Sequence, residues 1–193
     1  VDSAVSATTF MTTTTINDQD TATWSLTDDN TVANEVNEGA TASYTLALDG
    51  TFQNGEDATV DLEITFPGGL PSNDPADVDD FTNALLADIT SSITAYNGTA
   101  NGTYTVATVT ATEVTLTYTH GGTDGTADDL TIDLEVDHDD DSASNDLVEG
   151  PEDFTLTISD TGSASSTGVD SAVSATTFMT TTTINDQDTA TWS

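Results

Sequence analysis

The stretch TVATVTATEVTLTYTH, which runs from Thr105 to His120, alternates threonine with apolar residues over much of its length. A β-strand places successive side chains on opposite faces of a sheet, so this period of two predicts strands that are buried on one face only. The segment DFTLTISD, from Asp153 to Asp160, shows the same alternation. Threonine also fits a half-buried pleated surface well. The chain is therefore predicted to be mainly β.

Turn signals separate further segments of this kind. They are the dipeptides Asp49-Gly50, Asn54-Gly55, Asn101-Gly102 and Gly121-Gly122. Many short strands with such turns are typical of an antiparallel β-sandwich, which is the fold class that we expect. The predicted strands are Thr21–Thr27, Ala42–Leu48, Ala58–Phe66, Gly102–Thr110, Glu113–Thr119, Leu130–Val136, Phe154–Ser159 and the long run Ser171–Ile184.

One segment, Asn73–Tyr96, has the pattern of an amphipathic helix instead. Asp74 is expected to cap it and Pro75 to occupy its first turn. Its apolar stripe consists of Phe81, Leu85, Ile89 and Ile93, with Val78 alongside. We expect this stripe to pack on the following hairpin, Gly102–Thr119, and a partner-binding role for the helix is the alternative. The fold is thus predicted to carry a helix-plus-hairpin insertion over about residues 67–128.

The two ends of the chain carry the same 25 residues. VDSAVSATTFMTTTTINDQDTATWS occupies positions 1–25 and recurs unchanged at positions 169–193. The offset is 169 − 1 = 168 residues, which is long enough for a module with its own core and much longer than a solenoid repeat. The sequence therefore indicates a tandem array of large modules.

The charge balance restricts the partners of the chain. It has 35 acidic residues, no lysine or arginine, and no cysteine. Salt bridges between acidic side chains and lysine or arginine, disulfides and thiolate metal sites are thereby excluded. Nucleic acid and anionic membranes are poor partners for such a surface, and no membrane insertion is expected, whereas divalent cations are favourable partners.

Three segments resemble the Calx-β module, a calcium-binding sandwich found in exchangers and in bacterial surface proteins. VNEGATASYTLALDG (Val36–Gly50) resembles the family's first acidic turn and second strand, and LVEGPEDFTLTISD (Leu147–Asp160) is similar to its E-G-x-E-x-F strand. TTTINDQD resembles its last strand with an acidic end. The family's T-A-x-x-G-x-D-Y segment is missing, and the helix-plus-hairpin insertion stands in its place.

This resemblance implies where one module begins and ends. The last strand would end at Ile184, and the acidic NDQD would lie in the junction between modules. Residues 21–188 would then form one β-sandwich module, residues 1–20 the tail strand and junction of the preceding repeat, and residues 189–193 the start of the next one.

The acidic residues are candidate calcium ligands, because calcium takes six to eight oxygen ligands that converge from loops. By resemblance to the Calx-β motif, Glu38, Glu149 and Glu152 match best. The spacing of the acids does not fit an EF-hand. The alternative is that acidic loops only solvate a halotolerant secreted protein. The full candidate set is Glu38, Asp57, Asp137, Asp139, Asp140, Asp141, Glu149, Glu152, Asp153, the junction pair Asp18 and Asp20, and its copy Asp186 and Asp188.

The sequence does not predict a zinc, catalytic or sugar-binding site. His120 and His138 lack the partners of a zinc site and are predicted to lie on the surface. Without a basic residue to position a substrate, catalysis is not expected, so the chain is predicted not to be an enzyme. Trp24 and the tyrosines are predicted to pack in the core rather than to form a sugar-stacking platform.

Together these features predict a structural tandem-repeat module of a long extracellular or cell-surface stalk, adhesin or filament, stabilised by calcium. Its partners would be neighbouring identical repeats and other chains of a filament. A glycan-binding or adhesive module is one alternative. A subunit that donates a strand to another chain is the other, and in it one of the two copies of the repeated strand, Ser3–Ile16 or Ser171–Ile184, inserts into a different chain.

Overall fold

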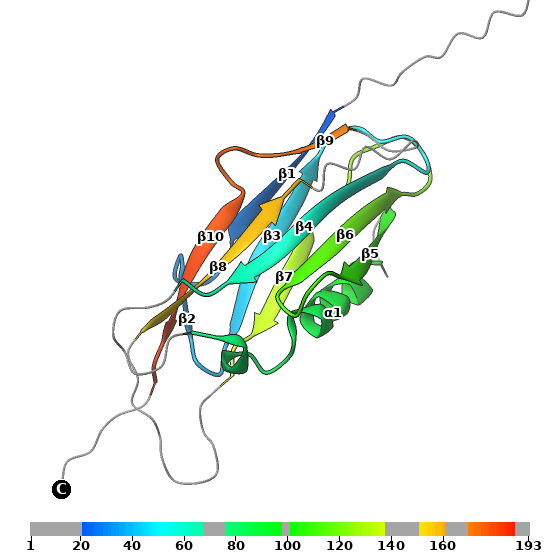
Figure 1. Ribbon diagram of the computed structural model, residues 1–193. Helices are drawn as coiled ribbons and strands as arrows, with labels where there is room; N and C mark the ends of the chain where they lie inside the picture. Colours follow the sequence, from blue (N-terminus) through cyan, green and yellow to red (C-terminus); the bar gives the residue numbers. More distant parts are fainter. Residues whose placement is uncertain (1–20, 68–75, 98–100, 138–150, 161–169, 188–193) are drawn as a thin grey trace, which may run out of the picture.

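The computed structural model describes residues 21–67, 76–97, 101–137, 151–160 and 170–187. These residues form two β-sheets packed face to face and one α-helix, so the predicted sandwich is confirmed (Figure 1). In chain order the elements are β1 (Thr21–Asp28), β2 (Glu35–Asn37), β3 (Thr41–Asp49), β4 (Asp57–Thr65), a 3₁₀ turn (Val78–Asp80), α1 (Leu85–Asn97), β5 (Gly102–Thr108), β6 (Glu113–His120), β7 (Leu130–Glu135), β8 (Glu152–Ser159), β9 (Asp170–Val173) and β10 (Met179–Asn185).

The two sheets differ in size. The smaller has the strand order β7-β3-β1-β9, and the larger has the order β2-β10-β8-β4-β6-β5. Most neighbours are antiparallel, but β1 pairs with β9 and β10 pairs with β2 in parallel. The hairpin β5–β6 continues the larger sheet, because β6 pairs with β4. The predicted hairpin is therefore part of the sandwich itself.

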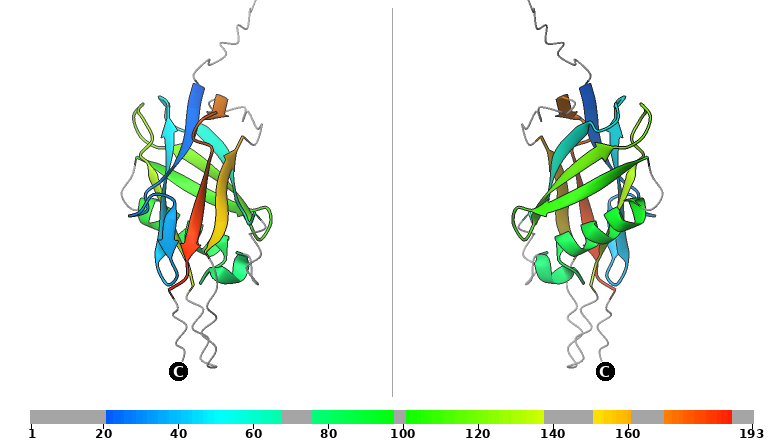
Figure 2. Two further views of the ribbon diagram at one scale, coloured as in Figure 1. Left: turned by 90° about the vertical axis from the view of Figure 1, so that its left-hand side faces the viewer. Right: turned by 90° about the vertical axis from the view of Figure 1, so that its right-hand side faces the viewer.

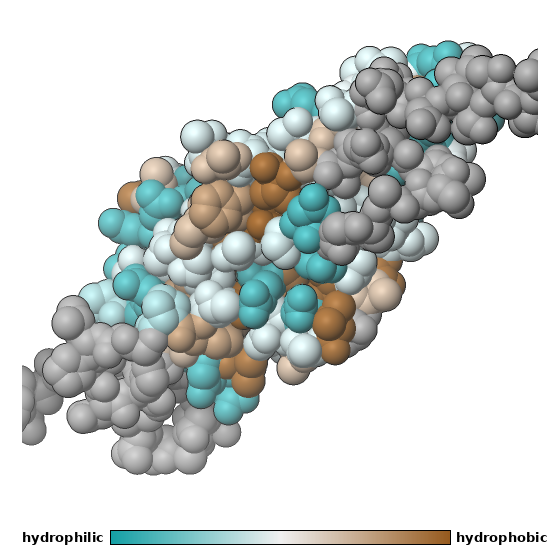
Figure 3. All heavy atoms as spheres, turned by 45° about the horizontal axis from the view of Figure 1, so that its top comes forward, coloured by the Kyte–Doolittle hydropathy of each residue, from teal (hydrophilic) through white to brown (hydrophobic). Residues whose placement is uncertain are grey.

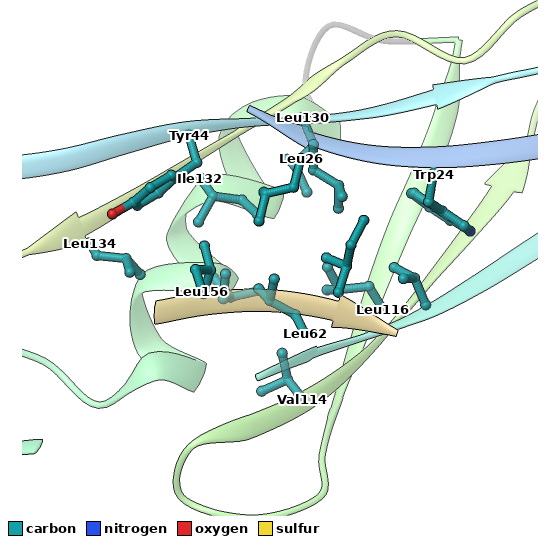
Figure 4. Packing of buried hydrophobic residues seen from close by; sticks show 14 of the residues in the cluster. Trp24, Leu26, Tyr44, Leu62, Val114, Leu116, Leu130, Ile132, Leu134 and Leu156 are labelled. Atoms are coloured by element: carbon teal, nitrogen blue, oxygen red, sulfur yellow. The ribbon is translucent and has the colours of Figure 1, made fainter. Parts of the chain in front are cut away.

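The core lies between the sheets and follows from the alternation in the sequence (Figure 4). In β6, Val114, Leu116 and Tyr118 are buried while the intervening threonines face outward. The smaller sheet contributes Trp24 and Leu26 to the same core. Fully burying one large apolar side chain stabilises a fold by about 1.5–3 kcal/mol. The apolar residues of each strand therefore determine which of its faces turns toward the core.

The outward face of the larger sheet is rich in threonine. Thr59 pairs with Thr117, and Thr117 pairs with Thr105, so three strands place threonines side by side. β-branched side chains pack well on such a surface. In the view of Figure 3, apolar and polar residues are mixed in small groups.

The helix is shorter than the sequence predicts. It begins at Leu85, and the predicted cap at Asp74 and Pro75 lies outside the described residues. Phe81 is extended and bridges Val136 instead of joining the helical stripe. The backbone around Phe81 is used for strand-like bonds, since Thr82 N donates to Glu135 O (2.9 Å).

The residues of the predicted stripe divide accordingly. Leu85, Ile89 and Ile93 are buried as expected, whereas Val78 is 51% exposed. The helical face therefore starts one turn later than the apolar spacing suggests.

The helix closes one side of the sandwich by contacting both β7 and β5, the edge strands of the two sheets (Figures 1 and 2). At the free edge of β7, Glu135 N donates to Asp88 Oδ2 (3.1 Å) and Asp133 N donates to the Ser92 hydroxyl (3.3 Å). At β5, the Asn97 amide makes two bonds to the Tyr104 backbone, of 2.8 and 3.0 Å. Side chains of the helix thus satisfy backbone groups that an edge strand would otherwise expose.

The predicted long strand Ser171–Ile184 is wrong as a single element. It divides into β9 in the smaller sheet and β10 in the larger sheet. The intervening residues bond to both sheets, because Leu26 N donates to Thr177 O (2.7 Å) and Ile158 N donates to Phe178 O (2.8 Å). Both parts pair with strands of their own chain, namely β1, β8 and β2.

Candidate metal-binding end

Four of the predicted calcium ligands lie at the same end of the sandwich. Glu38 is in the turn between β2 and β3, Asp137 follows β7, Glu152 begins β8, and Asp186 follows β10. We call this set, Glu38, Asp137, Glu152 and Asp186, the acidic pole. It lies at the lower end of the molecule in Figure 1, where β10 ends.

Backbone hydrogen bonds hold these segments together. Glu38 N donates to Asn185 O (3.3 Å), which ties the β2–β3 turn to the end of β10. Gly39 N donates to Asp137 O (3.1 Å), and Gly39 adopts a positive φ of 70°, which glycine tolerates without steric cost. Glu152 lies opposite Ile184 in the β8–β10 ladder. Four segments that are distant in sequence are therefore fixed beside one another.

Burial makes this end electrostatically demanding. Glu152 is only 8% exposed, and its Oε1 atom and the Oε2 atom of Glu38 are buried from solvent. Removing an ionised carboxylate from water costs several kcal/mol or more unless a positive charge or hydrogen bonds compensate for it. The chain has no lysine or arginine that could supply such a charge. Carboxylate oxygens of this kind are the ligands that calcium prefers in proteins.

The described residues do not complete a metal site by themselves. Within the ranges given above, no three histidine, aspartate or glutamate side chains converge closely enough to hold an ion. Seven further candidates lie outside the described residues, and these are Asp18, Asp20, Asp139, Asp140, Asp141, Glu149 and Asp188.

Two candidates do not share the position of Glu152. Asp57 begins β4 beside Thr119, at the other end of a strand of nine residues, roughly 26 Å from where β4 ends. Asp153 follows Glu152 directly and therefore faces the outer surface of the sheet, where its Oδ1 accepts a bond from the Thr183 hydroxyl (2.7 Å). Including these two residues in a common site with Glu152 is not supported by the fold.

His120 is buried rather than on the surface, contrary to the prediction. It is 2% exposed, and its Nε2 lies 3.0 Å from Thr123 O while its Nδ1 lies 2.8 Å from the Tyr118 hydroxyl. Because a carbonyl oxygen only accepts, Nε2 donates to Thr123 O. Both ring nitrogens of His120 are therefore within hydrogen-bond distance of protein atoms. His138 lies outside the described residues.

The aromatic residues are core residues, as predicted. Trp24, Tyr44, Tyr104 and Tyr118 are each at most 1% exposed, and Tyr96 is 8% exposed. Tyr104 contacts both Trp24 and Tyr118, with ring centroids 6.3 and 5.2 Å apart. A sugar-stacking platform requires exposed rings, and these five residues do not provide them.

Comparison with known proteins adds little to this geometry. No family model matches the chain, so the Calx-β resemblance stays a prediction. No curated protein matches it either. Among solved structures, the chain is similar to a chain of a crystal structure of a CaDoc0917–CaCohA2 complex at pH 5.5, with 13% identity and a TM-score of 0.33. The likeness covers 85% of this chain and 98% of the other. No helix in the described ranges is long and apolar enough to span a membrane.

Proposed function

We propose that this chain contributes a structural module to a long tandem array outside the cell, in which successive sandwiches are joined end to end through calcium. The observation that carries the proposal is the path of the chain. β1 begins at one end of the long axis and β10 ends at the opposite end, beside the acidic pole (Figures 1 and 2). A module with its entry and exit at opposite ends extends an array by its full length.

The repeated sequence sets the spacing between such modules. β10 ends at Asn185, and Thr189 is the counterpart of Thr21, the first residue of β1, because 21 + 168 = 189. Only Asp186, Gln187 and Asp188 separate them. If the second copy folds as the first does, four Cα–Cα steps join the two sandwiches, a reach of about 14 Å. A linker this short limits how neighbouring modules can turn relative to one another.

Carboxylates at both ends make calcium a suitable clamp for this junction. The end opposite the acidic pole carries Asp49, Asp57 and Asp160. Two unit charges of like sign 4 Å apart repel by about 1 kcal/mol in water and by about 4 kcal/mol near a protein surface. Without lysine or arginine, two such ends approach closely only when cations from solution lie between them. Divalent calcium, which prefers carboxylate oxygens, fits this requirement.

The strand pairing favours a covalent array over strand donation. β10 lies between β8 and β2 of its own chain, and β9 pairs with β1. The edges of β7 and β5 are covered by α1, and the other edge strands have only three and four residues. Little of the described sheet edge therefore remains for a strand of another chain. A mechanical role of this kind requires no catalytic site.

Small-angle X-ray scattering of a chain with two complete 168-residue units tests the proposal. We expect the maximum dimension in calcium to approach twice that of one unit, with a narrow range of shapes. A chelator should broaden this range, and sodium chloride at matched ionic strength should not replace calcium. A matched variant with Asp186→Asn and Asp188→Asn should bend in calcium as the parent does in chelator. Equal scattering in calcium and in chelator would contradict the calcium clamp, and a compact side-by-side pair would contradict the extended array.

A further inference from the structure

A cavity beneath the start of α1 has no role in the array proposed above. It has a volume of about 240 Å³ and lies between the 3₁₀ turn, α1 and the ends of β4 and β7. Its walls are mainly apolar and include Ile64, Phe66, Phe81 and Leu134. An apolar cavity of about 150 Å³ can hold benzene, so this one is large enough for a substituted ring.

One wall of the cavity carries a charge. Asp88 lines the cavity and is 5% exposed, with Oδ2 accepting from Glu135 N (3.1 Å). A second hollow of about 280 Å³ shares Asp88 and Asn83 with it and is also lined by Asp133 and Glu135. The apolar cavity thus adjoins a groove with three carboxylates.

This arrangement selects an occupant by charge as well as by shape. The chain has no lysine or arginine that could neutralise Asp88, Asp133 and Glu135. A neutral apolar molecule would add no positive charge beside the buried Asp88 carboxylate, whereas a cation there would form a charge-assisted hydrogen bond. Burial raises the pKa of Asp88, the direction expected for a carboxylate that is removed from water.

We propose that the cavity binds a small organic cation, with its apolar body between Phe66, Phe81 and Leu134 and its ammonium group beside Asp88 and Glu135. Val78, which is 51% exposed, and the exposed Ala84 and Ala111 line the same cavity. They form an apolar entrance.

Titration of the intact chain with phenethylamine, followed by NMR, tests this site. We expect saturable shifts confined to residues around Leu85, Asp88 and Leu134. Two related compounds separate the two parts of the site: 2-phenylethanol keeps the ring without the charge, and ethylamine keeps the charge without the ring. Each should bind at least about tenfold more weakly, the approximate value of one charge-assisted hydrogen bond or one buried ring. Shifts that do not saturate and spread over the acidic surface would overturn the proposal.

Substitutions then test separately how the Asp88 charge and the cavity contribute to binding. Asp88→Asn keeps an oxygen acceptor for Glu135 N and removes the charge, so it should weaken phenethylamine about tenfold and leave 2-phenylethanol unchanged. Asp61→Asn on the outer face of β4 is the matched control and should change neither. Ala84→Leu fills the entrance and should abolish binding of both rings while the thermal midpoint is retained. Unchanged phenethylamine affinity in Asp88→Asn, or in a folded Ala84→Leu, would refute the site.

Discussion

The Tyr44 hydroxyl and the Thr182 Oγ1 atom lie 2.7 Å apart in the interior and join the two sheets by a hydrogen bond. Tyr44 belongs to β3 and Thr182 to β10, and both are 0% exposed. Thr182 is one of four consecutive threonines, Thr180 to Thr183, and it is the fully buried member of that run. The bond therefore fixes the register in which the repeated segment enters its sandwich.

Removing either partner of this bond should destabilise the fold. Tyr44→Phe leaves the Thr182 hydroxyl buried without its partner. Thr182→Val likewise removes the partner of the buried Tyr44 hydroxyl. Each should lower the free energy of unfolding by about 1–3 kcal/mol, measured by urea denaturation. The double variant should cost less than the sum of the two, because no polar group is then orphaned. Thr103→Val on the exposed face of β5 is the control; additive effects of Tyr44→Phe and Thr182→Val would contradict a direct bond.

Calcium should stabilise the chain through the acidic pole. At a hundredfold excess over Kd, binding to the native state alone adds about 2.7 kcal/mol, which thermal unfolding in calcium and in chelator measures. Glu152→Gln should remove most of this gain, because it removes one charged oxygen ligand. Asp57→Asn, at the opposite end of the sandwich, and Asp153→Asn, on the outer face of β8, should retain the gain.

Two results would contradict this expectation. Midpoints that are equal in calcium and in chelator would exclude a calcium-linked fold. A gain lost equally in Glu152→Gln and in the two control variants would show that calcium acts by general screening.

Gly102 should not tolerate a side chain. A Cβ atom built at this position would lie 2.6 Å from Cζ of Tyr118, whose ring is buried and whose hydroxyl bonds to His120. Gly102→Ala must displace that ring and should cost about 1–3 kcal/mol in urea denaturation. Gly125→Ala is the matched control, since its nearest neighbour would be 3.7 Å away. Equal stability of the two variants would show that Tyr118 moves freely.

The charge of Asp88 should oppose folding at neutral pH. Burial raises the pKa of Asp88 in the native state, although bonds from Glu135 N and Asn83 lower it in part, and the charges of Glu135 and Asp133 raise it further. As pH falls through this raised pKa, the native state takes up a proton that the unfolded chain does not, so stability increases. Asp88→Asn should therefore be more stable than the parent at pH 7. Its advantage should shrink as the pH falls through the native pKa of Asp88.

Urea denaturation of both chains across this pH range measures the difference. The other acidic residues titrate alike in both chains, so the difference isolates Asp88. An advantage that grows toward low pH would reverse the assigned sign.

The sequence by itself determined the strands whose alternation is strong. β3, β4, β6 and β7 lie within one or two residues of their predicted bounds, because one face of each is buried against the opposite sheet. The buried stripe Leu85, Ile89 and Ile93 and the burial of Trp24 were also predictable from composition and spacing. The repeat at positions 1–25 and 169–193 is a property of the sequence alone.

Only the tertiary structure decided the rest. Alternation reports that a segment is half-buried but not which sheet buries it, so the change of sheet between β9 and β10 has no local signal. The start of α1 depends on the bonds that Phe81 and Thr82 make to β7, which are distant in sequence. Likewise, carboxylates look alike in the sequence, and contacts among four separate segments place Glu38 and Glu152 together while Asp57 lies at the opposite end. Long-range pairing distinguishes residues that local patterns cannot.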